Sequence, residues 1–244
     1  QRLGSSFKVV LAMRYQKPAL PKVLDELLRE GVGHVVLVPL FPQYSSAATG
    51  TALQEAMRIL GTYTDVPSVS SVGPFHADEG YLNAFKQRIE QHKPETYDHV
   101  LFSFHGLPDR HIQRSHTTCS GAMQKDLDST PVAGCPCEQG PYDKHPSCYK
   151  MQCHATARAL AQRSGLSSDR WSVGFQSRLD QKWVTPFSDR LIEQYAKAGM
   201  KNRNLEQERR ELRRKALAVA GVTAVFVVGF TLLTAGAARV APDL

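Results

Sequence analysis

A histidine directly follows a short, nearly continuous apolar run, at a position where its side chain could bind a metal or transfer a proton. Residues 99–104 read HVLFSF, and His105 follows them directly, just before Gly106 and Pro108. An imidazole titrates near neutral pH, so it can coordinate an incoming divalent metal or accept a proton, and a buried strand would fix its direction. The alternative is a histidine that caps the strand by bonding a backbone carbonyl. We take His105 as the candidate catalytic and metal-binding residue.

A second polar cluster also follows an apolar run and leads into a helical pattern. Residues 39–50 read PLFPQYSSAATG, and we expect their hydroxyl groups to face a cleft. Tyr44 combines an apolar ring with a polar tip, which suits a flat aromatic ligand. Ser46 and Thr49 are better explained as caps of the following helix, with no further role.

All five cysteines lie between Cys119 and Cys153. No signal peptide is visible, and thiols crowded into one segment of an enzyme-sized chain favour a metal or cluster site in a reducing compartment. Four thiolates could hold a 2Fe-2S cluster or a structural zinc, and buried thiols without metal are the third reading. The candidate ligands are Cys135, Cys137, Cys148 and Cys153, with Cys119 able to replace one of them. The histidines His111, His116 and His145 could also ligate, although loop histidines are more often solvated.

The elements that must position these residues alternate between strand and helix patterns. We expect strands over 7–13, 34–41, 68–72, 99–104 and 171–176, and helices over 21–30, 49–60, 80–92, 147–163 and 188–198. This order is typical of an α/β protein with parallel sheets. Ligands of such sheets bind outside the carboxyl ends of the strands, where both polar clusters stand.

The formal net charge of +7 is concentrated near the end of the chain. Residues 201–215 are rich in Arg, Lys and Glu and predict a charged juxtamembrane helix, while residues 216–238 carry no charge. At about 1.5 Å per residue the second segment reaches roughly 34 Å, enough for a transmembrane helix. The flanking basic residues place the body in the cytoplasm, anchored in the inner membrane. A buried core helix or a frameshift product are the alternatives. We expect no nucleic acid as partner, because the excess charge belongs to this segment.

Taken together, these motifs resemble those of the ferrochelatase family, which inserts ferrous iron into porphyrins. The resemblance includes AMRY at 12–15, GFQSR at 174–178 and WVTP at 183–186, in the family's order, and covers nearly all of residues 1–198. It implies a chelatase-like fold of two similar Rossmann-like domains with parallel sheets around a porphyrin cleft. We place the first partial domain at 1–95 and the second at 96–200, with a cysteine-rich insert at 113–153.

The resemblance also implies roles for individual residues. His105 matches the family's active-site histidine, which binds metal or takes pyrrole protons. The implied substrate-binding residues are Arg14, Tyr15, Gln43, Tyr44, Ser45 and Trp183. The substrates would be ferrous iron and protoporphyrin or coproporphyrin, with no nucleotide. Because some microbial members carry a 2Fe-2S cluster on cysteines, we prefer the cluster to zinc.

Two departures from the family pattern leave a second hypothesis open. The chain starts after the family's first strand, and residues from Arg203 onward replace a segment that supplies a carboxylate opposite the histidine. The alternative to a ferrochelatase is therefore a membrane-anchored, non-catalytic protein that binds a tetrapyrrole or a metal. A cobalt chelatase of the same fold is disfavoured by the PQYS and QSR segments. A homodimer is a further expectation.

Overall fold

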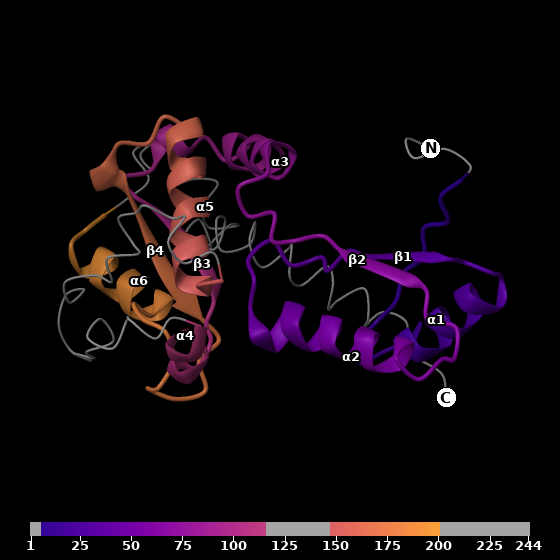
Figure 1. The fold of residues 1–244 in the computed structure, drawn as a ribbon. Helices are drawn as coiled ribbons and strands as arrows, with labels where there is room; N and C mark the ends of the chain where they lie inside the picture. The colour runs from indigo at the N-terminus through magenta and orange to yellow at the C-terminus, as the bar shows by residue number, and fades with distance from the viewer. Residues whose placement is uncertain (1–5, 116–146, 201–244) are drawn as a thin grey trace, which may run out of the picture. The chain divides into compact units, whose positions relative to one another are not determined.

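The computed structural model describes residues 6–115 and 147–200, which are drawn as coloured ribbon in Figure 1. The chain divides into two compact units, residues 1–74 and 75–244. The second unit begins before its first helix. The reason is packing, because Leu82 and Ile89 of that helix belong to the same buried cluster as Phe102.

The first unit is a pair of parallel strands covered by two helices. In chain order its elements are α1 (Leu20–Arg29), β1 (His34–Leu37), the π-helical turn η1 (Ser46–Gly50), α2 (Thr51–Leu60) and β2 (Ser68–Ser71). The strands pair in the register His34↔Ser68 to Leu37↔Ser71. Helices α1 and α2 lie on one face of this pair (Figure 1). Leu20 and Leu24, one helical turn apart, pack there against Val35, Ile59 and Leu60.

The second unit holds a longer parallel pair. Its elements are α3 (Glu79–Glu90), η2 (Pro94–Thr96), β3 (Val100–His105), α4 (Asp109–Ser115), α5 (Tyr149–Arg163), η4 (Ser168–Arg170), β4 (Trp171–Gln176) and α6 (Ser188–Lys197). The register runs from Val100↔Trp171 to His105↔Gln176, so both strands end at the same edge.

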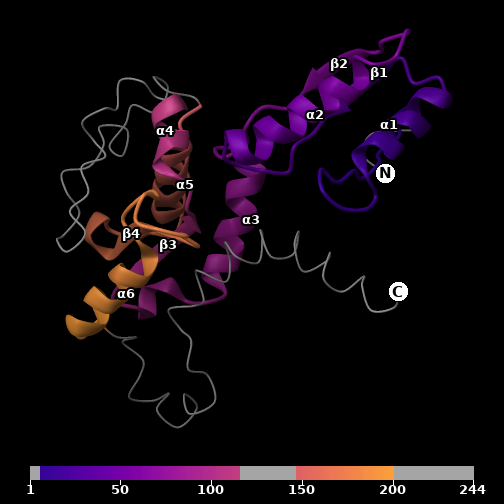
Figure 2. The same cartoon turned by 90° about the horizontal axis from the view of Figure 1, so that it is seen from below.

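Strand β3 is buried on both faces, because helices α5 and α6 lie on opposite sides of the pair (Figure 2). Phe102 and Phe104 join the cluster that α5 covers. On the other side, the Ser103 and Ser188 hydroxyls are hydrogen-bonded at 2.7 Å. A Cβ at Gly174 would approach the Ser188 Oγ to 2.8 Å, so glycine allows α6 to pack this closely on β4.

The α/β class with small parallel sheets is confirmed, but one predicted strand is wrong. Residues 7–12 form no strand, and Met13 makes only an isolated bridge with Ala19. Phe7, Val9 and Leu11 are 59%, 78% and 57% exposed. An alternation of apolar residues becomes a strand only when a neighbouring strand pairs with it and another layer covers it. The predicted insert also starts later than expected, since α4 continues to Ser115.

The predicted helices at 201–215 and 216–238 lie outside the described residues. Within 6–115 and 147–200, no helix is both long enough and apolar enough to cross a bilayer.

Candidate active site

His105 is the last residue of β3 and projects from the edge at which both strands end. Its Nδ1 lies 2.7 Å from the backbone oxygen of Gly106. A carbonyl oxygen only accepts hydrogen bonds, so Nδ1 carries the proton of the neutral ring and Nε2 carries the lone pair. The backbone contact that the sequence offered as an alternative is therefore present, and it selects the tautomer that a base or metal ligand needs.

Two hydrogen bonds fix the backbone around His105. The Tyr149 hydroxyl donates to the His105 oxygen at 2.9 Å, and the Gly106 N–H donates to the Gln176 oxygen at 2.7 Å. A Cβ on Gly106 would lie 2.8 Å from that same Gln176 oxygen, a distance that real Cβ atoms do not tolerate. Gly106 is thus required by the close approach of β4, which holds the turn after His105 in place.

Trp183 lies beside His105, with 6.5 Å between the ring centroids. The segment that carries it runs back along the turn after β3. The Val184 N–H donates to the Leu107 oxygen and the Asp109 N–H donates to the Lys182 oxygen, both at 2.9 Å. The structure therefore brings together the predicted catalytic histidine and the predicted tryptophan, which lie far apart in the sequence.

Tyr149 is a residue that the sequence analysis missed. Its hydroxyl bonds both the His105 backbone and the thiol of Cys153, and burial raises its pKa well above the usual value. No local motif marks this tyrosine. Its position at the first residue of the helix after the insert was the only signal available.

Of the five predicted cluster ligands, the structure describes two. Cys148 and Cys153 are 1% and 0% exposed, and Cys148 is the N-cap of α5, where its sulfur accepts from the Met151 N–H at 3.5 Å. Burial raises the pKa of Cys153 well above its usual value. Cys119, Cys135 and Cys137 lie outside the described residues, as do His116 and His145. The part of the chain that is described holds no group of three or more potential metal ligands.

His111, the remaining histidine proposed as a ligand, lies on α4. Its pKa is lowered by burial and by the neighbouring Arg110 and Arg114. A neutral imidazole is the form that metals bind, but its partners for such a site are not found among the described residues.

The second polar cluster, residues 39–50, belongs to the first unit. The residue that caps its helical turn differs from the expected ones. The Ser45 Oγ accepts from the Ala48 N–H at 3.1 Å, whereas the buried Thr49 hydroxyl has no hydrogen-bond partner in the part of the chain that the structure describes. Capping by Ser46 and Thr49 was therefore wrong, because the helix starts with a π-helical turn whose N-cap is Ser45. Gln43 and Tyr44 precede this cap, and the Tyr44 hydroxyl would be 3.3 Å from a Cβ at Gly50.

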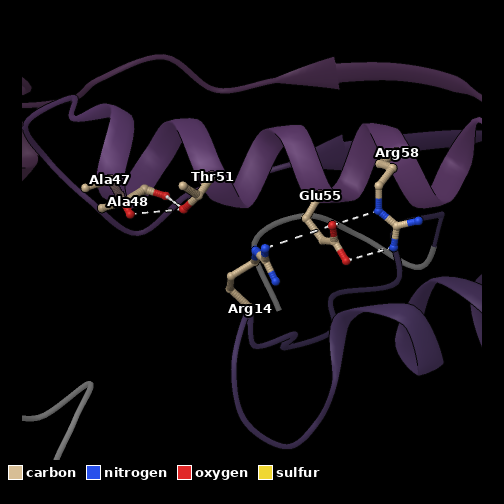
Figure 3. Close-up of polar contacts among 6 residues, drawn as sticks. All are labelled: Arg14, Ala47, Ala48, Thr51, Glu55 and Arg58. Atoms are coloured by element: carbon tan, nitrogen blue, oxygen red, sulfur yellow. Dashed lines mark hydrogen bonds and ion pairs between the residues drawn. The ribbon is translucent and has the colours of Figure 1, made fainter. Parts of the chain in front are cut away.

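Arg14 and Tyr15 lie in the same unit, on the loop between Met13 and Ala19. The Arg14 guanidinium stacks 4.6 Å from the centroid of the Tyr15 ring, which is itself 76% exposed. The Arg14 Nη2 lies 4.0 Å from the Glu55 Oε2. Figure 3 shows Glu55 on α2 between Arg14 and Arg58. Hydrogen bonds from Arg58 lower the pKa of Glu55.

The sequence analysis missed Glu55 and Arg58 as well. Their spacing of three residues in a predicted helix indicates an ion pair, but such pairs are usually solvated and carry no functional signal.

These two groups of residues stand on α/β units whose strands are parallel, with polar residues following the strand ends. The ferrochelatase family model matches residues 1–205. The chain is 39% identical to the ferrochelatase of Pseudomonas paraeruginosa (strain DSM 24068 / PA7) over 194 residues, which cover 79% of this chain and 54% of that protein. It is 36% identical to the ferrochelatase of Stutzerimonas stutzeri (strain A1501), with the same coverage.

The chain belongs to the ferrochelatase family. It spans about half the length of the curated relatives that it matches.

Proposed function

We propose that this chain inserts ferrous iron into a porphyrin, protoporphyrin or coproporphyrin, as a ferrochelatase of haem biosynthesis. The observation that carries the proposal is the position of His105, which ends β3 with its Nδ1 held at 2.7 Å from the Gly106 oxygen and its ring beside that of Trp183. The family membership supplies the reaction.

The reaction needs a base and a distorted macrocycle. A planar porphyrin points its four nitrogen lone pairs inward, so a bent porphyrin offers them to iron more readily. As iron binds, the two pyrrole N–H groups lose their protons in turn, and His105 accepts one proton at Nε2 and releases it to solvent before it takes the second. The Trp183 ring beside it gives an apolar surface on which the macrocycle can pack. Chelation is itself favourable, so no nucleotide is consumed.

We assign the other predicted residues to porphyrin binding on the strength of the family motifs. Tyr15 and Tyr44 offer rings, Arg14 offers hydrogen-bond donors, and Gln43 lies beside Tyr44 in the same loop. Ser45 acts through the turn that it caps.

The test is metal insertion by the purified chain, read from the shift of the visible absorption bands of the porphyrin when ferrous iron or zinc is added. We expect His105→Ala to lower the rate at least about 100-fold, the usual contribution of a general base. His92→Ala changes an exposed histidine after α3 and serves as the matched control, with the wild-type rate expected. Equal rates in the His105 and His92 variants would contradict the assignment.

We also propose a 2Fe-2S cluster on Cys135, Cys137, Cys148 and Cys153, with Cys119 able to replace one of them. The described pair fits such a site, because both thiols are shielded from solvent and an N–H group of α5 points at the Cys148 sulfur. A metal removes the thiol protons on binding, which overcomes the raised pKa of Cys153. When bound, the cluster would supply a covalent link among four points of the chain.

Iron and acid-labile sulfide measured on the purified chain, together with its visible absorption, test the cluster. The double variant Cys119→Ser/Cys137→Ser should lose both iron and sulfide, while Cys119→Ser alone should keep them. Stoichiometric zinc, or no metal in the wild type, would contradict the proposal.

A membrane anchor at 216–238, with the body in the cytoplasm, is a further proposal supported by the uncharged segment and its basic flank. Membranes washed with alkaline carbonate should retain the full chain, and its release into the wash would contradict the anchor. A homodimer stays a prediction, for which sedimentation of the detergent-solubilised chain is the test.

A further inference from the structure

Arg14 carries a donor, its Nε, that the described residues of its unit do not use. Its loop is tied at both ends, since the Met13 N–H donates to the Pro18 oxygen at 2.8 Å and the Leu20 N–H donates to the Met13 oxygen at 3.1 Å. The Arg14 Nε is buried and has no hydrogen-bond partner among the described residues. Buried donors are nearly always paired, so an unpaired one on a positioned side chain indicates a missing acceptor.

The geometry of a guanidinium defines which acceptor would fit. Nε and the adjacent Nη form one edge of the planar group, and two parallel N–H donors along such an edge match the two oxygens of a carboxylate. Tyr15 packs on the face of the same group at 4.6 Å, so the edge rather than the face is left for a ligand.

A carboxylate of the protein already stands close to this group but does not bond it. The Glu55 Oε2 lies 4.0 Å from the Arg14 Nη2, outside hydrogen-bond distance. Both Glu55 oxygens are instead occupied by Arg58, whose Nε donates to Oε2 and whose Nη2 donates to Oε1, each at 2.9 Å. Figure 3 shows the Glu55 carboxylate between the two guanidinium groups.

These distances describe a competition between two arginines for one carboxylate. Glu55 is 19% exposed and has Arg14 as its next cation, so a Glu55 released from Arg58 would need to move only about 1 Å to bond Arg14. An ion pair between Arg14 and Glu55 would occupy the N–H donors that a ligand needs. The Arg58 side chain is 64% exposed, and its Nε and Nη2 both donate to Glu55.

We propose that the Nε edge of Arg14 binds a carboxylate of the substrate, and that Arg58 keeps this edge open by holding Glu55 away from it. The inference rests on the proposed function, because the porphyrins named above carry carboxylate side chains. Arg58 and Glu55 touch no substrate in this scheme. Both are positioning residues that set how strongly Arg14 can bind.

The experiment compares an acidic porphyrin with its neutral ester. The purified full chain is titrated with mesoporphyrin, which has two carboxylates, and with its dimethyl ester, and binding is read from quenching of the fluorescence of Trp171 and Trp183. We expect Arg58→Ala to weaken mesoporphyrin binding about tenfold, the effect of one lost charge-assisted contact, and to leave ester binding unchanged. In the double variant Arg58→Ala/Glu55→Gln, the competitor has no charge, so mesoporphyrin affinity should return to the wild-type value.

Arg58→Lys provides an intermediate, because an ammonium holds Glu55 at one point instead of two, and its affinity should fall between those of the wild type and Arg58→Ala. Rescue by the double variant separates the proposed competition from a loss of structure, since a misfolded helix would not recover when a second residue is changed. A double variant as weak as Arg58→Ala, or an equal loss with the ester, would overturn the inference alone. A wild type that binds neither porphyrin would overturn the proposed function and this inference with it.

Discussion

The Tyr149 hydroxyl donates to the backbone oxygen of His105 across 2.9 Å, and so connects the start of α5 to the end of β3. Both residues belong to the second unit, and the contact acts on the backbone rather than on the imidazole. Tyr149 therefore influences where the imidazole points without competing for its nitrogens.

Removing this hydroxyl should lower the rate of metal insertion without unfolding the protein. In Tyr149→Phe the ring still fills its place, while the hydroxyl loses its contact with the Cys153 thiol and its hydrogen bond to the His105 oxygen. The second is worth about 1 kcal/mol, so we expect the rate to fall several-fold. The measurement is the rate of zinc insertion at saturating porphyrin. Tyr63→Phe removes the same atom from a hydroxyl that bonds Asp25 in the first unit, and its rate should stay at the wild-type value. A loss of the same size in both variants would show that the Tyr149 contact has no special role.

Gly106→Ala should damage the site far more than an ordinary glycine substitution. The new Cβ would meet the Gln176 oxygen at 2.8 Å, so the turn after His105 must move. We expect a loss of about 1–3 kcal/mol in the free energy of unfolding, measured by urea denaturation, and a large loss of metal insertion. Gly33→Ala is the control, because nothing lies within 4 Å of its added Cβ. Wild-type activity in Gly106→Ala would mean that the turn does not need its present geometry.

His76 should make the protein less stable in mild acid. Burial lowers its pKa below the ordinary value of 6.5, and its buried Nδ1 has no hydrogen-bond partner within residues 6–115 and 147–200. The unfolded chain then takes up a proton near pH 6.5 that the folded protein resists. The free energy of unfolding therefore keeps its full value above pH 6.5. It falls as the pH drops below this value, by at most about 1.4 kcal/mol per pH unit for one proton.

The measurement is urea denaturation of the wild type and of His76→Gln between pH 5 and pH 7. His76→Gln should flatten the pH dependence, while His92→Gln, at an exposed position, should leave it as in the wild type. Identical slopes in the wild type and His76→Gln would contradict the prediction.

Much of the fold could be predicted because local pattern and tertiary environment agree. The run at 171–176 became β4 with the predicted bounds, and the amphipathic pattern at 188–198 became α6. The placement of His105 at the end of a buried strand followed from the apolar run before it. The sequence predicted less well wherever partners decide the outcome, as at residues 7–12, whose apolar side chains have no strand to pair with in the described structure.

The parts of the site that escaped prediction are contacts between distant residues. Glu55 and Arg58 form an ordinary helical ion pair in the sequence, and only the fold brings Arg14 within 4.0 Å of it. Tyr149 bonds a backbone atom 44 positions away, and a backbone acceptor leaves no signature in the amino-acid sequence. By contrast, His105 and Trp183, whose ring centroids lie 6.5 Å apart, were assigned to one site from family motifs and not from their spacing in the sequence.

The π-helical turn at Ser46–Gly50 lets the first unit hold one extra residue without redirecting its loop. A π turn fits one residue more than an α turn into about the same full rotation. Deleting a single alanine from this turn would therefore let the helix begin as a regular α-helix while Tyr44 keeps its direction about the axis of α2. The same deletion inside the regular part of α2 would rotate everything before it by about 100°. The turn thus makes this point of the chain tolerant of a one-residue change in length that the rest of the helix would not accept.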